Sequence, residues 1–127
     1  MNSGSSDHPL HRVLIVDDDQ IEREMLVELL TAPNRSVEAF GSGNAALEFL
    51  NQNAVDFALL DHVMPGLSGI ELAGKIKVMY PDARIIMCSG YLIEASNPKL
   101  LEQADQVLHK PLNLGQILHL ADADAAR

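Results

Sequence analysis

Directly after four short apolar runs, the sequence places side chains that can bind a cation or a phosphoryl group. They are the aspartates Asp17, Asp18 and Asp19, then Asp61, Ser89 and Lys110. Carboxylates that crowd together repel one another, so either one of them stays protonated or a cation neutralises them. A site with only oxygen ligands and several retained waters suits Mg²⁺. If these residues converge, they indicate a magnesium-dependent reaction of a phosphoryl group.

A magnesium site at this point would use three carboxylates and one main-chain oxygen. Asp18 and Asp61 are expected to bind the ion directly, and Asp17 is expected to help through a water molecule. The main-chain carbonyl of Val63 can supply a further oxygen, because this contact needs no particular side chain.

The same set of residues contains the groups that phosphoryl transfer requires. Asp61 is expected to attack an incoming phosphoryl group as a nucleophile. The ammonium of Lys110, together with the ion, would neutralise the charge on the transferring oxygens, and the hydroxyl of Ser89 would hydrogen-bond one of them. Because acyl phosphates are labile, water can later reset Asp61. This is the chemistry of a switch rather than of a metabolic enzyme.

To bring these residues together, the chain must set its apolar runs side by side as strands. The predicted strands are residues 13–16, 37–40, 57–60, 84–88 and 106–108. Helical patterns alternate with them, which predicts an α/β fold: a doubly wound parallel sheet of five strands with helices on both faces. In such sheets, ligands bind beyond the carboxyl ends of the strands. The polar residues listed above therefore belong to one edge.

Three helices are expected to begin at a capping-box pattern, in which a short polar residue is followed three positions later by Glu or Gln. The pairs are Asp19 with Glu22, Ser68 with Glu71, and Asn113 with Gln116. Asn97 and Pro98 predict the start of a short fourth helix. The apolar stripe expected on the first helix comprises Ile21, Met25, Leu26, Leu29 and Leu30.

The composition excludes several classes of function. The formal net charge is −9 and the nine basic residues are scattered, which argues against direct binding of nucleic acid. No apolar run approaches the roughly 20 residues of a membrane span, and no secretory signal is recognisable, so we expect a cytoplasmic protein without a membrane partner. The 127 residues suit one domain, which we place at 11–122, between a flexible leader (1–10) and a tail (123–127).

Taken together, four segments resemble the receiver domains of response regulators in two-component signalling. They are RVLIVDDD (12–19), ALLDHVMPGLSGIEL (58–72), IIMCSGY (85–91) and LHKPL (108–112). The resemblance implies a flavodoxin-like strand order 2-1-3-4-5 and a cis peptide between Lys110 and Pro111. It also implies that Asp61 accepts a phosphoryl group from a histidine kinase or a histidine phosphotransfer protein. The chain would then be a signalling domain, which catalyses only its own phosphorylation and dephosphorylation and switches conformation for a partner or output domain.

The sequence departs from the usual receiver pattern at three points. Val107 occupies a position that is commonly Tyr or Phe, Ser89 stands where Thr is commoner, and the fourth helix is short, at about 97–103. In the usual account the aromatic ring moves inward when the hydroxyl residue turns toward the phosphoryl group, and Val107 has no ring. We expect Ser89 and residues 90–103 to change conformation, and the fourth helix, fifth strand and fifth helix to form the readout face.

Two other functions fit parts of the pattern. Asp17 and Asp19, two residues apart after an apolar strand, match the first motif of haloacid-dehalogenase-type phosphatases, with Asp17 as the nucleophile. That interpretation leaves Asp61 without a role. The second alternative is a receiver-like interaction module that is never phosphorylated, which Val107 favours and the complete acidic set opposes.

Overall fold

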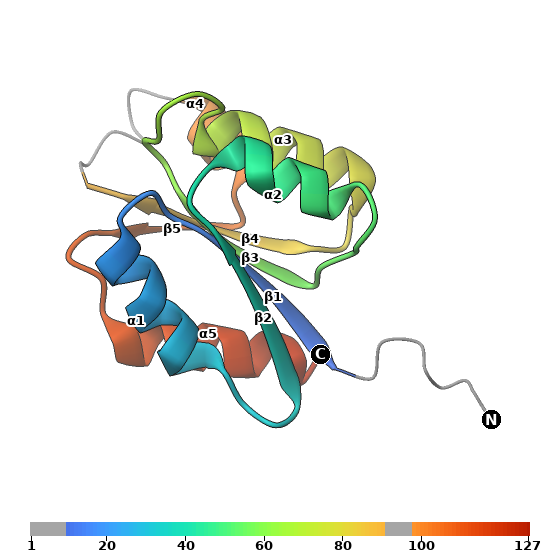
Figure 1. Cartoon of the computed structure of the whole chain (residues 1–127), viewed down its shortest axis with the longest axis vertical. Helices are drawn as coiled ribbons and strands as arrows, with labels where there is room; N and C mark the ends of the chain where they lie inside the picture. The colour runs from blue at the N-terminus through green and yellow to red at the C-terminus, as the bar shows by residue number, and fades with distance from the viewer. Residues whose placement is uncertain (1–9, 91–97) are drawn as a thin grey trace.

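A computed structural model describes residues 10–90 and 98–127 and shows a five-stranded parallel sheet between two layers of helices (Figure 1). The strands are β1 (His11–Val16), β2 (Arg35–Phe40), β3 (Phe57–Asp61), β4 (Arg84–Ser89) and β5 (Gln106–His109). Their order across the sheet is β2-β1-β3-β4-β5, and each neighbouring pair is parallel. The predicted fold class and strand order are confirmed.

Five helices connect and flank these strands. They are α1 (Gln20–Leu30), α2 (Gly43–Leu50), α3 (Gly69–Met79), α4 (Pro98–Gln103) and α5 (Leu114–Ala125). Helices α1 and α5 lie on one face of the sheet, and α2, α3 and α4 lie on the other (Figure 1). The predicted cap at Asn97 and the segment 91–97 lie outside the described residues.

Alternate residues of each central strand enter two separate cores, one on each face of the sheet. On β1, Leu14 and Val16 pack with residues of α2 and α3, whereas Val13 and Ile15 pack with residues of α1 and α5. All four side chains are buried. Since both faces are covered, the central strands are apolar along their whole length, as parallel strands usually are.

The predicted stripe on α1 is only partly correct. Leu26 and Leu30 are buried and Leu29 packs against the same core, but Ile21 is 78% exposed and Met25 is 44% exposed. The helix is therefore anchored along the row that contains Leu26 and Leu30. Ile21 and Met25 form a neighbouring row that faces away from the sheet.

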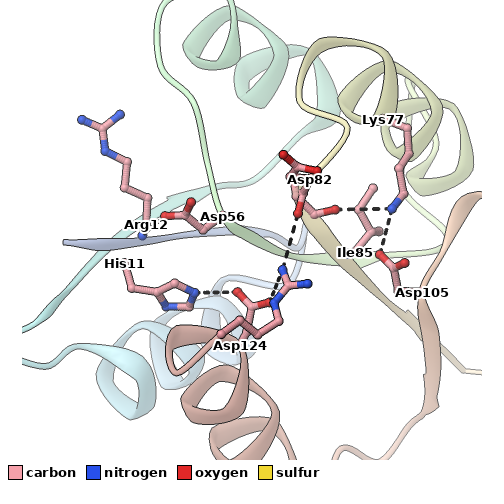
Figure 2. Close-up of polar contacts among 10 residues, drawn as sticks. His11, Arg12, Asp56, Lys77, Asp82, Ile85, Asp105 and Asp124 are labelled. Carbon is pink, nitrogen blue, oxygen red and sulfur yellow. Dashed lines mark hydrogen bonds and ion pairs between the residues drawn. The ribbon is translucent and has the colours of Figure 1, made fainter. Parts of the chain in front are cut away.

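Acidic side chains tie down the amino ends of the strands, at the edge opposite to the predicted site. Asp56 accepts a hydrogen bond from the backbone N–H of Arg12 at 2.9 Å. Asp105 accepts one from the backbone N–H of Ile85 at 2.7 Å and forms an ion pair with Lys77 at 2.9 Å. Figure 2 shows Lys77 pointing toward Asp105 across this edge. Several of the surplus carboxylates thus have a structural role rather than a purely solubilising one.

The end of α5 is fixed at the same edge. Asp124 is buried, and its Oδ2 lies 2.7 Å from Nε2 of His11 at the start of β1 (Figure 2). The helix continues to Ala125, so it includes the first three residues of the segment that the sequence assigned to a tail.

The turn from β3 into α3 approaches the strand so closely that position 69 has no room for a side chain. A Cβ on Gly69 would lie 2.2 Å from the carbonyl oxygen of Asp61. We expect Gly69→Ala to lower the free energy of unfolding by about 1–3 kcal/mol, because the backbone that carries Asp61 must move. Urea denaturation measures this change.

Gly74→Ala is the matched control within α3. The nearest atom to a Cβ at Gly74 is the flexible Gln103 side chain, at 3.5 Å. Alanine should therefore leave stability unchanged or raise it by up to about 1 kcal/mol, the usual gain over glycine inside a helix. Equal effects of the two substitutions would contradict the steric argument.

Candidate functional site

The carboxyl ends of β1, β3, β4 and β5 bring the predicted site residues to one edge of the sheet. Asp17 follows β1, Asp61 and Ser89 are the last residues of β3 and β4, and Lys110 follows β5. Backbone hydrogen bonds continue the ladder into this edge: the N–H of His62 donates to the carbonyl of Cys88, and that of Lys110 to the carbonyl of Ser89, both at 2.8 Å. These four residues thus lie at one edge of the sheet, where the sequence predicted them.

Three carboxylates converge at this edge from two different strands. One oxygen each from Asp17, Asp18 and Asp61 lies within 4.8 Å of the others. Asp17 and Asp61 are buried, at 3% and 7% exposure, whereas Asp18 is exposed. Asp19 is not part of this cluster, because its side chain caps α1 by accepting the N–H of Glu22 at 3.1 Å. Asp19 is therefore the predicted cap, and the roles of Asp17 and Asp18 as metal ligands stay a prediction.

Burial raises the pKa of both inner carboxyls. For Asp61 the pKa rises to about 6 because burial outweighs the opposing attraction of Lys110. For Asp17 it rises to about 7, through burial and a hydrogen bond with Glu22, against the backbone N–H of Asp19 that stabilises its anion. Ionising either carboxyl costs free energy because the group is buried. A bound cation would offset this cost and favour ionisation of both, so the pair is well suited to hold one.

Lys110 is the cation of the site. Its Nζ lies 3.3 Å from Oδ1 of Asp61 and 2.9 Å from Oε1 of Glu22. Burial works against the charged ammonium, but these carboxylates, together with Asp17, raise its pKa above the ordinary value. The peptide between Lys110 and Pro111 is cis, as the resemblance implied.

Ser89 and Val63 occupy the positions that the sequence indicated. Ser89 is buried at 1% exposure on the central strand β4, beside β3 with Asp61. Val63 lies two residues after Asp61, with a side chain that is 64% exposed. The role of its main-chain carbonyl as a metal ligand stays a prediction.

Glu22 is the site residue that sequence reasoning missed. The sequence assigned it to a capping box with Asp19, but the backbone N–H of Asp19 donates to Oδ1 of Asp17 instead, at 2.9 Å. The Glu22 side chain is therefore available to Lys110 and Asp17. By contrast, Ser68 and Glu71 form both bonds of the box at the start of α3. The one signal that pointed to Glu22 was its place in the first turn of a helix that begins at the site.

His62 directly follows Asp61 and is also buried, at only 8% exposure. Burial lowers the pKa of its imidazole below the ordinary value.

The raised pKa values of Asp17 and Asp61 predict how stability depends on pH in the absence of metal. Above their ordinary pKa of 3.8, the folded state retains protons that the unfolded state has released, up to about pH 6 for Asp61 and about pH 7 for Asp17. The free energy of unfolding should therefore fall as the pH rises through this window. Denaturation in the presence of a chelator, between about pH 5 and pH 8, measures the slope.

Asp17→Asn is the comparison that isolates this effect. It removes one of the two raised groups, so its stability should fall less steeply with pH than that of the wild type. His62, whose lowered pKa acts in the opposite direction below its ordinary value, is present in both proteins. An identical slope in the two proteins would contradict the titration of Asp17 in this window.

The sequence matches the profile of the response regulator receiver domain family over residues 13–122. This chain belongs to that family. The match includes β1 from Val13 onward, the other four strands and all of the site residues named above. The receiver domain has relatives in proteins of very different length, and two of them show the range.

One relative is the response regulator receiver protein CpdR of Brucella abortus, which is 33% identical over 87% of this chain and 92% of its own length. Another is a cyclic di-GMP phosphodiesterase of Thermotoga maritima, 38% identical over 91% of this chain but only 31% of the relative. This receiver domain therefore corresponds to one part of the longer relatives. The receiver itself is a signalling domain, whatever the activity of the protein that contains it.

Solved receiver structures share the fold. The BeF3-activated receiver domain of DrrB superposes with a TM-score of 0.84 at 26% identity, covering 93% of this chain and 99% of that one. The response regulator TrrA of Thermotoga maritima, in complex with Mg²⁺-BeF, gives a TM-score of 0.80 at 30% identity, covering 91% and 99%. Within the described residues of the present receiver, no helix has the length and apolar character needed to cross a membrane.

Proposed function

We propose that this receiver accepts a phosphoryl group on Asp61 from a histidine kinase or a histidine phosphotransfer protein, in a magnesium-dependent reaction. The observation that carries the proposal is the convergence of Asp17, Asp18 and Asp61 within 4.8 Å, with the ammonium of Lys110 3.3 Å from Asp61. Nucleophile, cation ligands and charge-neutralising group thus share one edge of the sheet, which is the arrangement that phosphoryl transfer needs.

The donor set of this edge fits Mg²⁺. Asp18 and Asp61 would hold the ion directly, Asp17 through water, and the Val63 carbonyl would add a further oxygen. When bound, the ion would supply positive charge that offsets the charge of the phosphoryl oxygens. The raised pKa values of Asp17 and Asp61 support this assignment, because burial makes their anions costly even beside Lys110, and a cation would offset that cost. The assignment of Mg²⁺ is also supported by TrrA, which is 30% identical to this chain and was solved in complex with Mg²⁺-BeF.

The chain's own residues then divide the work of transfer. An ionised oxygen of Asp61 forms the bond to phosphorus, while the imidazole nitrogen of the donor histidine leaves with the electrons of the breaking P–N bond. Lys110 neutralises the oxygens that gain charge during transfer. Ser89, on the neighbouring strand, donates its hydroxyl to one phosphoryl oxygen. Later attack of water on the phosphorus returns Asp61 to its carboxylate.

The output step is proposed to run through Ser89 and residues 90–103, toward a partner or an output domain. Residues 91–97 of this segment lie outside the described part of the chain. Val107 is partly buried, packs against the core formed with α2 and α3, and is paired with Met87 of β4. It fills its position with an aliphatic side chain, so the signal passes without a ring rotation. We infer that the readout face comprises α4, β5 and α5.

The test is to incubate the protein with a small acyl phosphate, with and without Mg²⁺, and to measure its intact mass. We expect one phosphoryl adduct, formed only when Mg²⁺ is present. Reductive trapping with borohydride before digestion should place the adduct within β3, at Asp61. An adduct on Asp17 would instead favour the phosphatase chemistry, and the absence of both an adduct and magnesium binding would favour the unphosphorylated interaction module.

A further inference from the structure

Lys110 has two carboxylate partners, and the nearer one is not the phosphate acceptor. Its Nζ is 2.9 Å from Glu22 but 3.3 Å from Asp61. Both side chains of the closer pair are mostly shielded, with 26% of Lys110 and 20% of Glu22 exposed. An ion pair in this setting is less screened by solvent than one on the open surface. The resting position of the ammonium is therefore determined as much by α1 as by β3.

The position of Glu22 follows from the way α1 begins. Asp19 caps the helix through its side chain, while its own N–H is taken by Asp17. In a capping box, the carboxylate at the third helical position, here Glu22, accepts the backbone N–H of the cap residue. The N–H of Asp19 already donates to Asp17, so it is not available to Glu22. Glu22 instead reaches over the edge of the sheet, where its Oε1 lies 2.9 Å from the ammonium of Lys110 and its charge affects the pKa of Asp17.

During transfer, the positive charge of Lys110 must be directed toward the oxygens of the phosphoryl group, which is not yet bonded to Asp61. While the ammonium stays in its ion pair with Glu22, its charge is directed away from the phosphoryl group. The carboxylate of Glu22 is also a fixed negative charge beside a group that arrives with nearly two negative charges. Both effects, the hold on Lys110 and the repulsion of the phosphoryl group, oppose the transfer to Asp61.

We propose that Glu22 is a positioning residue that holds Lys110 away from the incoming phosphoryl group and thereby limits the rate at which Asp61 is phosphorylated. The inference rests on the proposed function and adds a restraint to it. Phosphorylation is complete only when the ammonium leaves Glu22 for the phosphoryl oxygens. The Glu22–Lys110 pair thus favours the unphosphorylated state of the receiver.

The test compares the rate of adduct formation, at saturating Mg²⁺, in the wild type, Glu22→Gln and Glu24→Gln. Glutamine retains the shape of Glu22 without its charge, so we expect Glu22→Gln to be phosphorylated roughly tenfold faster, as the loss of one charge-assisted bond predicts. Glu24 lies on the exposed side of the same helix, where it accepts from Gln20, and its glutamine variant should match the wild type. An unchanged or slower rate in Glu22→Gln would overturn the inference.

A double-mutant cycle with Lys110→Met shows whether Glu22 acts through the ammonium. In the Lys110→Met background, Glu22→Gln should accelerate the reaction much less, because the ammonium that it releases is missing and only the charge repulsion is relieved. An equal acceleration in both backgrounds would overturn the positioning role, since it would indicate simple charge repulsion. A wild type that forms no adduct at Asp61 would refute the proposed function and this inference with it. A labelled wild type without acceleration in Glu22→Gln would refute the inference alone.

Discussion

Asp61→Asn is expected to form no phosphoryl adduct above background under conditions in which the wild type is fully labelled. The amide has nearly the shape of the carboxylate, but it lacks the anionic oxygen that forms the bond to phosphorus. It also removes one of the three carboxylates that lie within 4.8 Å of one another, so magnesium affinity should fall as well. Intact mass measures the adduct, and calorimetric titration measures the affinity.

The matched control for this substitution is Asp82→Asn. Asp82 is exposed and lies near the start of β4, at the opposite edge of the sheet (Figure 2), and the substitution makes the same change in charge. This variant should be labelled like the wild type. If the adduct persisted in Asp61→Asn and disappeared in Asp17→Asn, Asp17 would be the nucleophile. Loss of the adduct in both Asp61→Asn and Asp82→Asn would indicate an effect of net charge.

The convergence of the site was predictable because it follows from topology. In a parallel sheet all carboxyl ends lie at one edge, so an apolar run followed by Asp17, Asp61, Ser89 or Lys110 is enough to place each residue there. The residues of β1 pack alternately into the two cores, which shows why the runs themselves were recognisable, since a strand covered on both faces must be apolar throughout. No knowledge of side-chain contacts was needed for either conclusion.

The contacts of Glu22 were not predictable, because a single sequence pattern is compatible with two arrangements. Asp19 with Glu22 and Ser68 with Glu71 have the same spacing, but only the second pair forms the full capping box. The outcome at α1 depends on whether Asp17 takes the N–H of Asp19, which is a property of the folded edge. The exposure of Ile21 and Met25 has a similar origin, since the periodicity marks an apolar row but not which row meets the sheet.

Lys110→Met should slow phosphorylation by about 100-fold to 1,000-fold, the usual cost of removing one preorganised group that stabilises charge in the transition state. At the same time it should strengthen magnesium binding. The ammonium lies 3.3 Å from Oδ1 of Asp61 and competes there with any other cation, so its removal leaves the carboxylates with more uncompensated charge. A variant that binds the metal more tightly and reacts more slowly cannot be explained by partial unfolding. Rates come from the time course of adduct formation, and affinities from calorimetric titration.

Lys77→Met is the control for the loss of one positive charge away from the site. Lys77 also pairs with a carboxylate, Asp105, at 2.9 Å, but at the opposite edge of the sheet. We expect its loss to cost about 0.2–1 kcal/mol of stability, the usual range for an ion pair near the surface, and to leave both the rate and the magnesium affinity unchanged. Parallel changes in both lysine variants would contradict a specific role for Lys110. Weaker magnesium binding in Lys110→Met would show that the ammonium supports the carboxylate cluster rather than competing with a cation for it.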